Sequence, residues 1–360
     1  MDTQSHMDKT YVIATHNFAF GTSQALRKYF DRNKISHIFI EHELFANPLT
    51  WFLGMADTFW KVLQKKEHFD VFIGSNRLNA FVGIWLKKVG KISKVVYFSP
   101  DWVDDRFGKN NILNHMYQWM DYFCILHADI TWNSSTVMDI DPMMQKRLDH
   151  HYPKRFIKKQ IQVPDGTDAF PYINLQDVNP FRMGFIGHLR TGMGAEMIIK
   201  TYLKIKKDIP QLSCVIIGSG PEEERLREMA ENTDIEFTGY MGDISNVYKT
   251  LSSCAIALAP YQDVKDNMSL YTDPGKVKVY LSVSLPVIIT KVPQIAYEIH
   301  QKKAGIAIND NEDEYIRAVI QLLSDQKTLE QYRQNAYNLS KKYSWDHIFQ
   351  RAIMQTFSNK

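Results

Sequence analysis

A short segment in the second half of the chain combines a helix start with two lysines. It is TDPGKVK, residues 272–278. Aspartate is a favoured N-cap and proline a favoured first helical residue, so we expect Asp273 to cap a helix that begins at Pro274. Lys276 would then lie in the first turn, where the helix dipole disfavours a cation by about 0.3–1 kcal/mol. Such a lysine either extends into solvent or binds an anion that the helix terminus also attracts.

Three glycine-containing loops follow segments that we expect to be strands. They are GTS at 21–23, GHLRTGMG at 187–194 and GSGP at 218–221. Backbone N–H groups in such loops, and the helix N-termini behind them, bind phosphate in open α/β sheets. Arg190 adds a cation to the second loop, so together with Lys276 it predicts a clamp for a diphosphate. Neither half has a full GxGxxG fingerprint or a Walker lysine motif, which disfavours NAD and ATP chemistry.

Polar residues elsewhere are weaker candidates. Asp101 follows the predicted buried strand Val95–Ser99, where it either orders a hydroxyl of a sugar or an acceptor, or only caps a turn. The D-x-D at 139–141 precedes a proline and is interpreted as a helix cap. Nothing with ligand spacing accompanies the histidine pair at 150–151, so no metal site is predicted.

Twelve short apolar or β-branched segments alternate with segments of helical periodicity. Runs of this kind are typical of parallel strands buried on both faces, and repeated βα units predict a doubly wound sheet. The predicted fold class is therefore α/β, with two Rossmann-like parallel-sheet domains facing a cleft. The predicted strands are Tyr11–Thr15, His37–Ile40, Val71–Gly74, Val95–Ser99, Ile130–Asn133, Ile161–Pro164, Arg182–Gly187, Ser213–Gly218, Ile235–Thr238, Ala255–Pro260, Pro286–Thr290 and Gly305–Ile308.

A chain of 360 residues suits two domains, and turn-forming residues are dense between 164 and 180. We place the first domain at 8–168 and the second at 178–342. Residues 343–360 would form a last helix. That helix either packs on the second domain or crosses back to the first.

Bulk composition excludes several classes of protein. A net charge of +3, with 44% hydrophobic and 23% charged residues, is typical of a soluble globular protein and gives no support to nucleic-acid binding. The three cysteines are isolated, which argues against a disulfide framework and against structural zinc. Without an apolar run long enough to span a bilayer or a signal peptide, the expected location is the cytoplasm.

Residues 47–66 are rich in aromatic and aliphatic side chains and end in two lysines. A helix of this composition is typical of contact with an anionic membrane, here the inner face. The other interpretation is that these side chains complete the core of the first domain. The residues concerned are Trp51, Phe52, Leu53, Trp60, Val62, Leu63, Lys65 and Lys66.

Five segments, in the same order along the chain, resemble motifs of the family 4 glycosyltransferases, which have the GT-B fold. They are VPDGTD at 163–168, GHLR at 187–190, VIIGSGP at 215–221, FTGYM at 237–241, and PGK at 274–276 with LPVI at 285–288.

The resemblance implies retaining transfer of a sugar from a nucleoside diphosphate sugar to a glycan or lipid-linked acceptor, with no catalytic metal and no other cofactor. Diphosphate binding falls on Arg190 and Lys276, and base contact on Tyr240 and Met241. With Asp101, these two cations form the predicted catalytic set. The full predicted donor-binding set is Gly21, Gly187, His188, Arg190, Gly218, Tyr240, Met241, Asp273, Pro274, Gly275 and Lys276.

The sequence departs from the family pattern at two places. The E-x7-E pair of the family falls on Tyr271 and Val279, and the arginine of its G-R-L loop is His188. The second glutamate of the pair normally engages the ribose. Two alternatives therefore stay open, a sugar-nucleotide epimerase of the same fold and a catalytically silent binding subunit.

Overall fold

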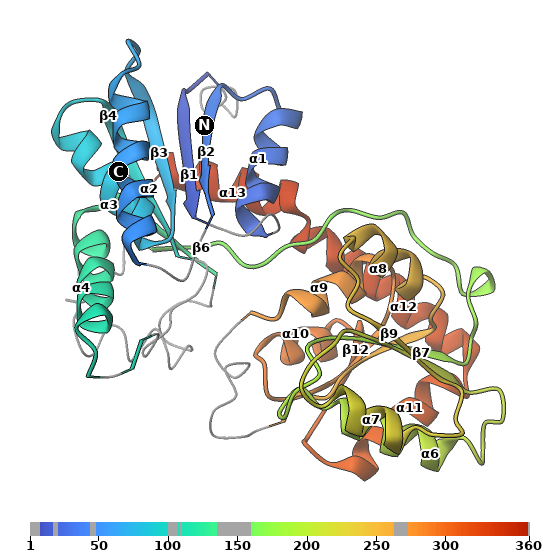
Figure 1. The fold of residues 1–360 in the computed structure, drawn as a ribbon. Coiled ribbons are helices and arrows are strands. Elements are labelled where there is room, and N and C mark those ends of the chain that lie inside the picture. Colours follow the sequence, from blue (N-terminus) through green and yellow to red (C-terminus); the bar gives the residue numbers. More distant parts are fainter. Residues whose placement is uncertain are drawn as a thin grey trace. The chain divides into compact units, whose positions relative to one another are not determined.

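The structure, a computed structural model, describes residues 8–16, 21–43, 48–99, 107–108, 110–134, 160–262 and 273–358. The chain divides into two compact units (Figure 1). The first unit is Met1–Pro164 with Trp345–Lys360, and the second is Asp165–Ser344. Each contains one six-stranded parallel sheet with helices on both faces, which confirms the predicted α/β class.

The sheet of the first unit has the strand order β2-β1-β3-β4-β5-β6, and all its pairings are parallel. The chain therefore reverses its direction across the sheet between β1 and β3. The elements are β1 (Tyr11–His16), α1 (Thr22–Arg32), β2 (His37–His42), α2 (Pro48–Leu63), β3 (Phe69–Ser75), α3 (Arg77–Lys88), β4 (Ile92–Ser99), α4 (Ile112–His127), β5 (Ile130–Asn133), β6 (Gln160–Gln162) and α13 (Trp345–Ser358).

Helices α2, α3 and α4 cover one face of this sheet, and α1 and α13 cover the other. Successive strand residues point to opposite faces. Val12 and Ala14 of β1 therefore belong to the core under α2–α4, whereas Ile13 belongs to the core under α1 and α13. Trp51 of α2 is 6% exposed and lies in the first of these cores, so of the two interpretations of residues 47–66 the core interpretation holds for this side chain.

The last helix of the chain, α13, packs against α1 in the first unit (Figure 1). Ile348, Phe349 and Ala352 are buried there in one core with the strands. The buried Trp132 of β5 donates its Nε1–H to Thr356 Oγ1 at 2.9 Å. These contacts make α13 part of the first unit although the second unit precedes it in sequence.

The second unit has the strand order β12-β11-β10-β7-β8-β9, again parallel throughout. Its elements are η3 (Leu175–Asp177), β7 (Arg182–Ile186), α6 (Ala195–Ile205), β8 (Ser213–Ile217), α7 (Glu223–Met229), β9 (Ile235–Gly239), α8 (Ile244–Leu251), β10 (Ile256–Ala259), α9 (Gly275–Ser282), β11 (Val287–Thr290), α10 (Ile295–Gln301), β12 (Gly305–Ile308), α11 (Glu312–Leu323), α12 (Gln326–Ser340) and η5 (Lys341–Tyr343).

Helices α6, α7 and α11 cover one face of the second sheet, and α8, α9, α10 and most of α12 cover the other. The predicted strands are confirmed in both units, with ends that differ by a few residues. The predicted linker between 168 and 178 lies within the second unit. It is held there because the Ile173 N–H donates to Ser284 Oγ at 3.2 Å and the Ile173 carbonyl accepts from the Arg333 guanidinium at 3.0 Å.

Candidate functional site

The second sheet has a topological switch point between β7 and β10. From β7 the chain proceeds to β8 and β9 on one side, and β10 starts the series that runs to β12 on the other. Open α/β sheets bind ligands at the carboxyl ends of the strands beside such a point. Here the loop at 187–194 follows β7, and Pro260 and Tyr261 follow β10.

Backbone hydrogen bonds hold the 187–194 loop against the loop that follows β8. The Gly187 N–H donates to the Ile217 carbonyl at 3.0 Å, and the Leu189 N–H donates to Ser219 at 2.9 Å. Gly218 has φ +135°, and a Cβ on it would lie 1.9 Å from the Gly187 carbonyl oxygen. Glycine at 218 is therefore required by the close approach of two backbone segments, whether or not a ligand binds there.

We expect Gly218→Ala to destabilise the protein by about 2–5 kcal/mol, because left-handed strain and overpacking add. Gly239→Ala is the matched control. Gly239 also has positive φ, +69°, but a Cβ there meets nothing within 4 Å. Its cost should be only the strain, about 1–2 kcal/mol. Urea unfolding of both variants measures the difference, and equal midpoints would contradict the crowding argument.

Helix α9 begins at Gly275 with Pro274 at the N-cap position, and no side chain caps it. The predicted N-cap role of Asp273 is therefore wrong. Its carboxylate instead accepts hydrogen bonds from Lys278 Nζ and from the backbone N–H of Asp165, the latter at 3.0 Å. The Lys278 side chain is 0% exposed, and its charge requires a counter-ion that only Asp273 supplies in the described part of the chain.

Lys276, one turn earlier on the same helix, is in a different situation. The residue is partly exposed as a whole, but its Nζ atom is enclosed and has no hydrogen-bond partner among the described residues. Nζ lies 4.6 Å from the ring centre of Phe185 on β7 and 4.3 Å from that of Tyr261 after β10. It also lies 3.4 Å from where a Cβ on Gly187 would be. The ammonium is thus placed at the switch point.

Burial lowers the pKa of Lys276 from 10.5 to about 7. A shift of this size corresponds to roughly 5 kcal/mol of penalty for the charged form. Two aromatic rings offset part of that penalty through cation–π attraction, about 0.5–2 kcal/mol each, but they accept none of its three N–H groups well. An anion at this place would satisfy the ammonium and raise its pKa again.

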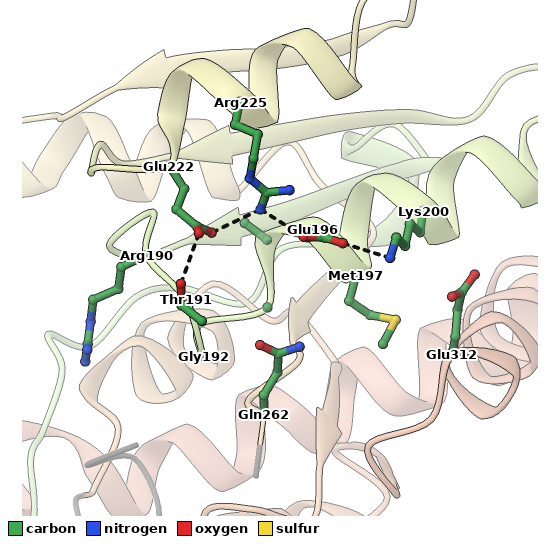
Figure 2. A pocket seen from close by; sticks show the side chains of 12 residues that line it. Arg190, Thr191, Gly192, Glu196, Met197, Lys200, Glu222, Arg225, Gln262 and Glu312 are labelled. Atoms are coloured by element: carbon green, nitrogen blue, oxygen red, sulfur yellow. Dashed lines mark hydrogen bonds and ion pairs between the residues drawn. The ribbon is translucent and has the colours of Figure 1, made fainter. Parts of the chain in front are cut away.

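Arg190 lies on the same loop, and its side chain is exposed. In Figure 2 it points away from Glu222 and Arg225, and no carboxylate pairs with it in the part of the chain that the structure describes. Its guanidinium is available to an anion.

The cavity in Figure 2 has a structural role. Thr191 donates to Glu222 at 3.0 Å, and Arg225 pairs with Glu222 at 3.2 Å and with Glu196 at 2.8 Å. Its volume is about 140 Å³, below the roughly 300–1,000 Å³ of ordinary ligand pockets. These paired charges fix the loop against α6 and α7.

The other predicted donor residues of this unit surround the same edge. His188 is exposed on the β7 loop. Tyr240 and Met241 directly follow β9; Tyr240 is 74% exposed, whereas Met241 packs partly against the core. Val279 of α9 also packs against that core.

In the first unit, the switch point between β1 and β3 carries a polar cluster that sequence reasoning missed. Buried His16, the last residue of β1, bonds through Nδ1 to Asn79 Oδ1 at 3.0 Å. The Asn79 amide donates to the Ser75 carbonyl at 2.8 Å, so its oxygen accepts and His16 Nδ1 carries the proton. Burial lowers the pKa of His16 to about 4, which keeps the ring neutral. A histidine directly after an apolar run was the available signal.

Gly21 lies immediately before α1 with φ +134°, and that helix has no side-chain cap. Ser23 of its first turn donates to Ser75 Oγ at 2.8 Å. Asp101, Tyr271, the D-x-D at 139–141 and the histidine pair at 150–151 lie outside the described residues. Within the described residues, no helix is long and apolar enough to cross a bilayer, and no cluster of three His, Cys, Asp or Glu has the arrangement of a metal site.

The second unit matches a known protein family. Residues 168–339 match the family described as glycosyl transferases group 1. An uncharacterized glycosyltransferase of Methanocaldococcus jannaschii is 28% identical over 176 residues, which cover 46% of this chain and 42% of that protein. The match therefore spans less than half of the relative's length. Both similarities support a transferase, with the group 1 pattern in the second unit.

Solved structures show the same fold over the whole chain. HepE of Anabaena, solved with UDP, has a TM-score of 0.65 at 12% identity and covers 98% of this chain and 100% of its own. Sucrose-phosphate synthase of Thermosynechococcus elongatus has a TM-score of 0.68 at 13% identity, with the same coverage. At these identities the likeness shows the fold, which is GT-B.

Proposed function

We propose that the protein is a glycosyltransferase of the family 4 type that takes its sugar from a nucleoside diphosphate sugar. The observation that carries the proposal is the enclosed, unpartnered ammonium of Lys276 at the switch point of the second unit. The known ligands of a structural neighbour agree with it, since HepE has been solved with UDP and with UDP-glucose.

In this proposal the diphosphate lies between the 187–194 loop and the N-terminus of α9. Lys276 and Arg190 neutralise it, and the free backbone N–H groups at Gly275 and Lys276 add hydrogen-bond donors. Cations held at the leaving group stabilise the negative charge that develops there as the sugar departs. In the same proposal Tyr240 and Met241 contact the nucleotide base, and the two cations take the place of a metal ion.

Retention of the anomeric configuration completes the donor side, with the acceptor hydroxyl attacking from the face that the diphosphate leaves. Asp101 of the first unit is the proposed ligand of an acceptor or sugar hydroxyl. The proposed acceptor is a glycan or a lipid-linked sugar, reached from the cytoplasm at the inner face of a membrane.

One observation favours a second candidate, a subunit that binds a donor without turnover. The position of the family's second glutamate is Val279, whose side chain packs into the core. Such a subunit would bind nucleotide with a similar Lys276 dependence but release no nucleoside diphosphate from a nucleotide sugar. An assay for that release, with and without candidate acceptors, separates the two functions. Release also argues against the epimerase alternative, since epimerisation conserves the nucleotide sugar.

A thermal-shift panel of nucleoside diphosphates and their sugars tests the donor site. A ligand at about 100 times its Kd stabilises a fold by about 2.7 kcal/mol, which raises the Tm of a unit of this size by several degrees. We expect the shift in wild type and in Lys302→Ala, an exposed lysine of the same unit. It should be strongly reduced in Arg190→Ala and in Lys276→Ala. No shift with any nucleotide would contradict the proposed function.

A further inference from the structure

Helix α2 carries apolar side chains on two opposite faces. Trp51, Met55 and Val62 are buried against the sheet. At about 100° per residue, a second set of side chains falls within an arc of about 100° on the opposite side of the helix. That set is Leu49 at 62% exposure, Phe52 at 46%, Leu53 at 62% and Trp60 at 58%.

The two neighbouring helices on the same face of the sheet continue this surface. Helix α2 packs against α3, and α3 packs against α4 (Figure 1). The exposed apolar residues on α3 and its end are Trp85 at 43% and Val89 at 54%. On α4, Ile112 is 80% exposed and Trp119 is 53% exposed. Surface hydrophobic side chains are usually scattered singly, so a concentration of this kind on three adjacent helices indicates an interaction surface.

The charge around these side chains is positive on balance. The sequences of α2, α3 and α4 contain only two carboxylates, Asp57 and Asp121, and Asp121 is 1% exposed. Lysines occur at the ends of the helices, and Lys88 Nζ lies 4.3 Å from the ring centre of Trp85. Lys61 and Lys87 pair with Asp57 and Asp129, each at 2.6 Å. The other lysines are Lys65, Lys66, Lys88 and Lys91, against one further exposed carboxylate, Glu67.

We propose that the exposed apolar faces of α2, α3 and α4 dock on an anionic lipid membrane. Tryptophan belongs at the boundary between headgroups and acyl chains, and lysine next to it binds lipid phosphate. The excess of lysines over carboxylates makes the surface complementary to negative lipid headgroups. Docking here is independent of the donor site, which lies in the second unit, and it would place an acceptor held in the membrane near the first unit.

Sedimentation with vesicles of phosphatidylcholine, with and without phosphatidylglycerol, tests this surface in the full chain. We expect partition into the anionic vesicles, weakening with salt, and a blue shift of tryptophan emission. The double variant Leu53→Gln/Trp60→Gln should lose at least tenfold in partition. Lys65→Gln/Lys66→Gln should lose several-fold, mostly at low salt. The matched control Leu203→Gln/Tyr297→Gln removes two exposed apolar side chains of the second unit and should behave as wild type.

Nucleotide-induced thermal shift on the same variants separates this inference from the proposed function. The thermal shift should be the same in wild type and in Leu53→Gln/Trp60→Gln. If wild type binds no nucleotide, the proposed function fails, but the vesicle experiment still tests the membrane surface. Equal partition of wild type and this variant would overturn the membrane surface. So would a wild-type dimer that this variant dissociates while neither binds vesicles, because the surface would then join two copies of the chain.

Discussion

Lys276→Met should abolish nucleotide binding and at the same time stabilise the ligand-free protein. Binding should fall by roughly 100-fold, since a charge-assisted contact to the diphosphate is lost. Stability should rise by roughly 2–4 kcal/mol at pH 7, because methionine fills a similar volume between Phe185 and Tyr261 without a buried charge. Few substitutions improve stability and remove function together, and those that do occupy sites built for a ligand.

The pH dependence of stability checks the physical reason. The folded pKa of Lys276 is lowered to about 7, so between pH 7 and 10.5 the unfolded chain binds more protons than the folded one. Wild-type stability should therefore gain about 2 kcal/mol from this residue between pH 7 and 9, and the advantage of Lys276→Met should shrink accordingly. Urea unfolding at the two pH values measures both. A variant less stable than wild type at pH 7 would contradict an unpartnered ammonium.

Asp273→Asn should destabilise the second unit by about 3–5 kcal/mol. It removes the counter-ion of Lys278, whose side chain is 0% exposed, and leaves an uncompensated buried charge. Lys276 and Lys278 are two residues apart on one helix. Removing the partner of Lys278 should lower stability, whereas removing the charge of Lys276 should raise it.

Asp234→Asn is the control for this prediction. Asp234 pairs with Lys206 at 2.6 Å, but its side chain is 70% exposed. Exposed ion pairs contribute little to stability, so the midpoint of urea unfolding should hardly move. If both aspartate variants lose the same stability, burial of the Lys278–Asp273 pair is not what holds the start of α9.

The strands were predictable because each is a short buried run whose residue types leave few alternatives. Val71–Gly74, for example, lies inside β3, which is buried for most of its length. The start of α9 was not predictable, although its residues follow the local rules for an N-cap. The carboxylate of Asp273 could serve the helix end or Lys278, and the buried charge outweighs a cap of about 1 kcal/mol. That competition depends on burial, which the local pattern does not contain.

Within the site, the sequence identified Lys276 as a candidate anion ligand. It could not show that Lys278 has a carboxylate partner whereas Lys276 has none among the described residues. The difference lies in contacts from β7 and from the residues after β10, which are distant in sequence. For α2 the sequence did contain the signal that separates buried from exposed tryptophans. Trp51 and Trp60 are nine residues apart, which on a helix turns them to opposite sides, so one packs inward and the other is exposed. His16 was missed because a single histidine at a strand end has no motif.

The most direct test of the phosphate site is calorimetric titration with the most stabilising nucleotide sugar at pH 8, in two buffers of different ionisation enthalpy. In the free protein Lys276 is mostly neutral at this pH, and a bound diphosphate should protonate it. The prediction is uptake of about 0.9 proton per bound nucleotide in wild type. Lys302→Ala should match wild type. Tight binding in wild type with no proton uptake, or unchanged binding in Lys276→Met, would show that Lys276 does not hold the phosphates.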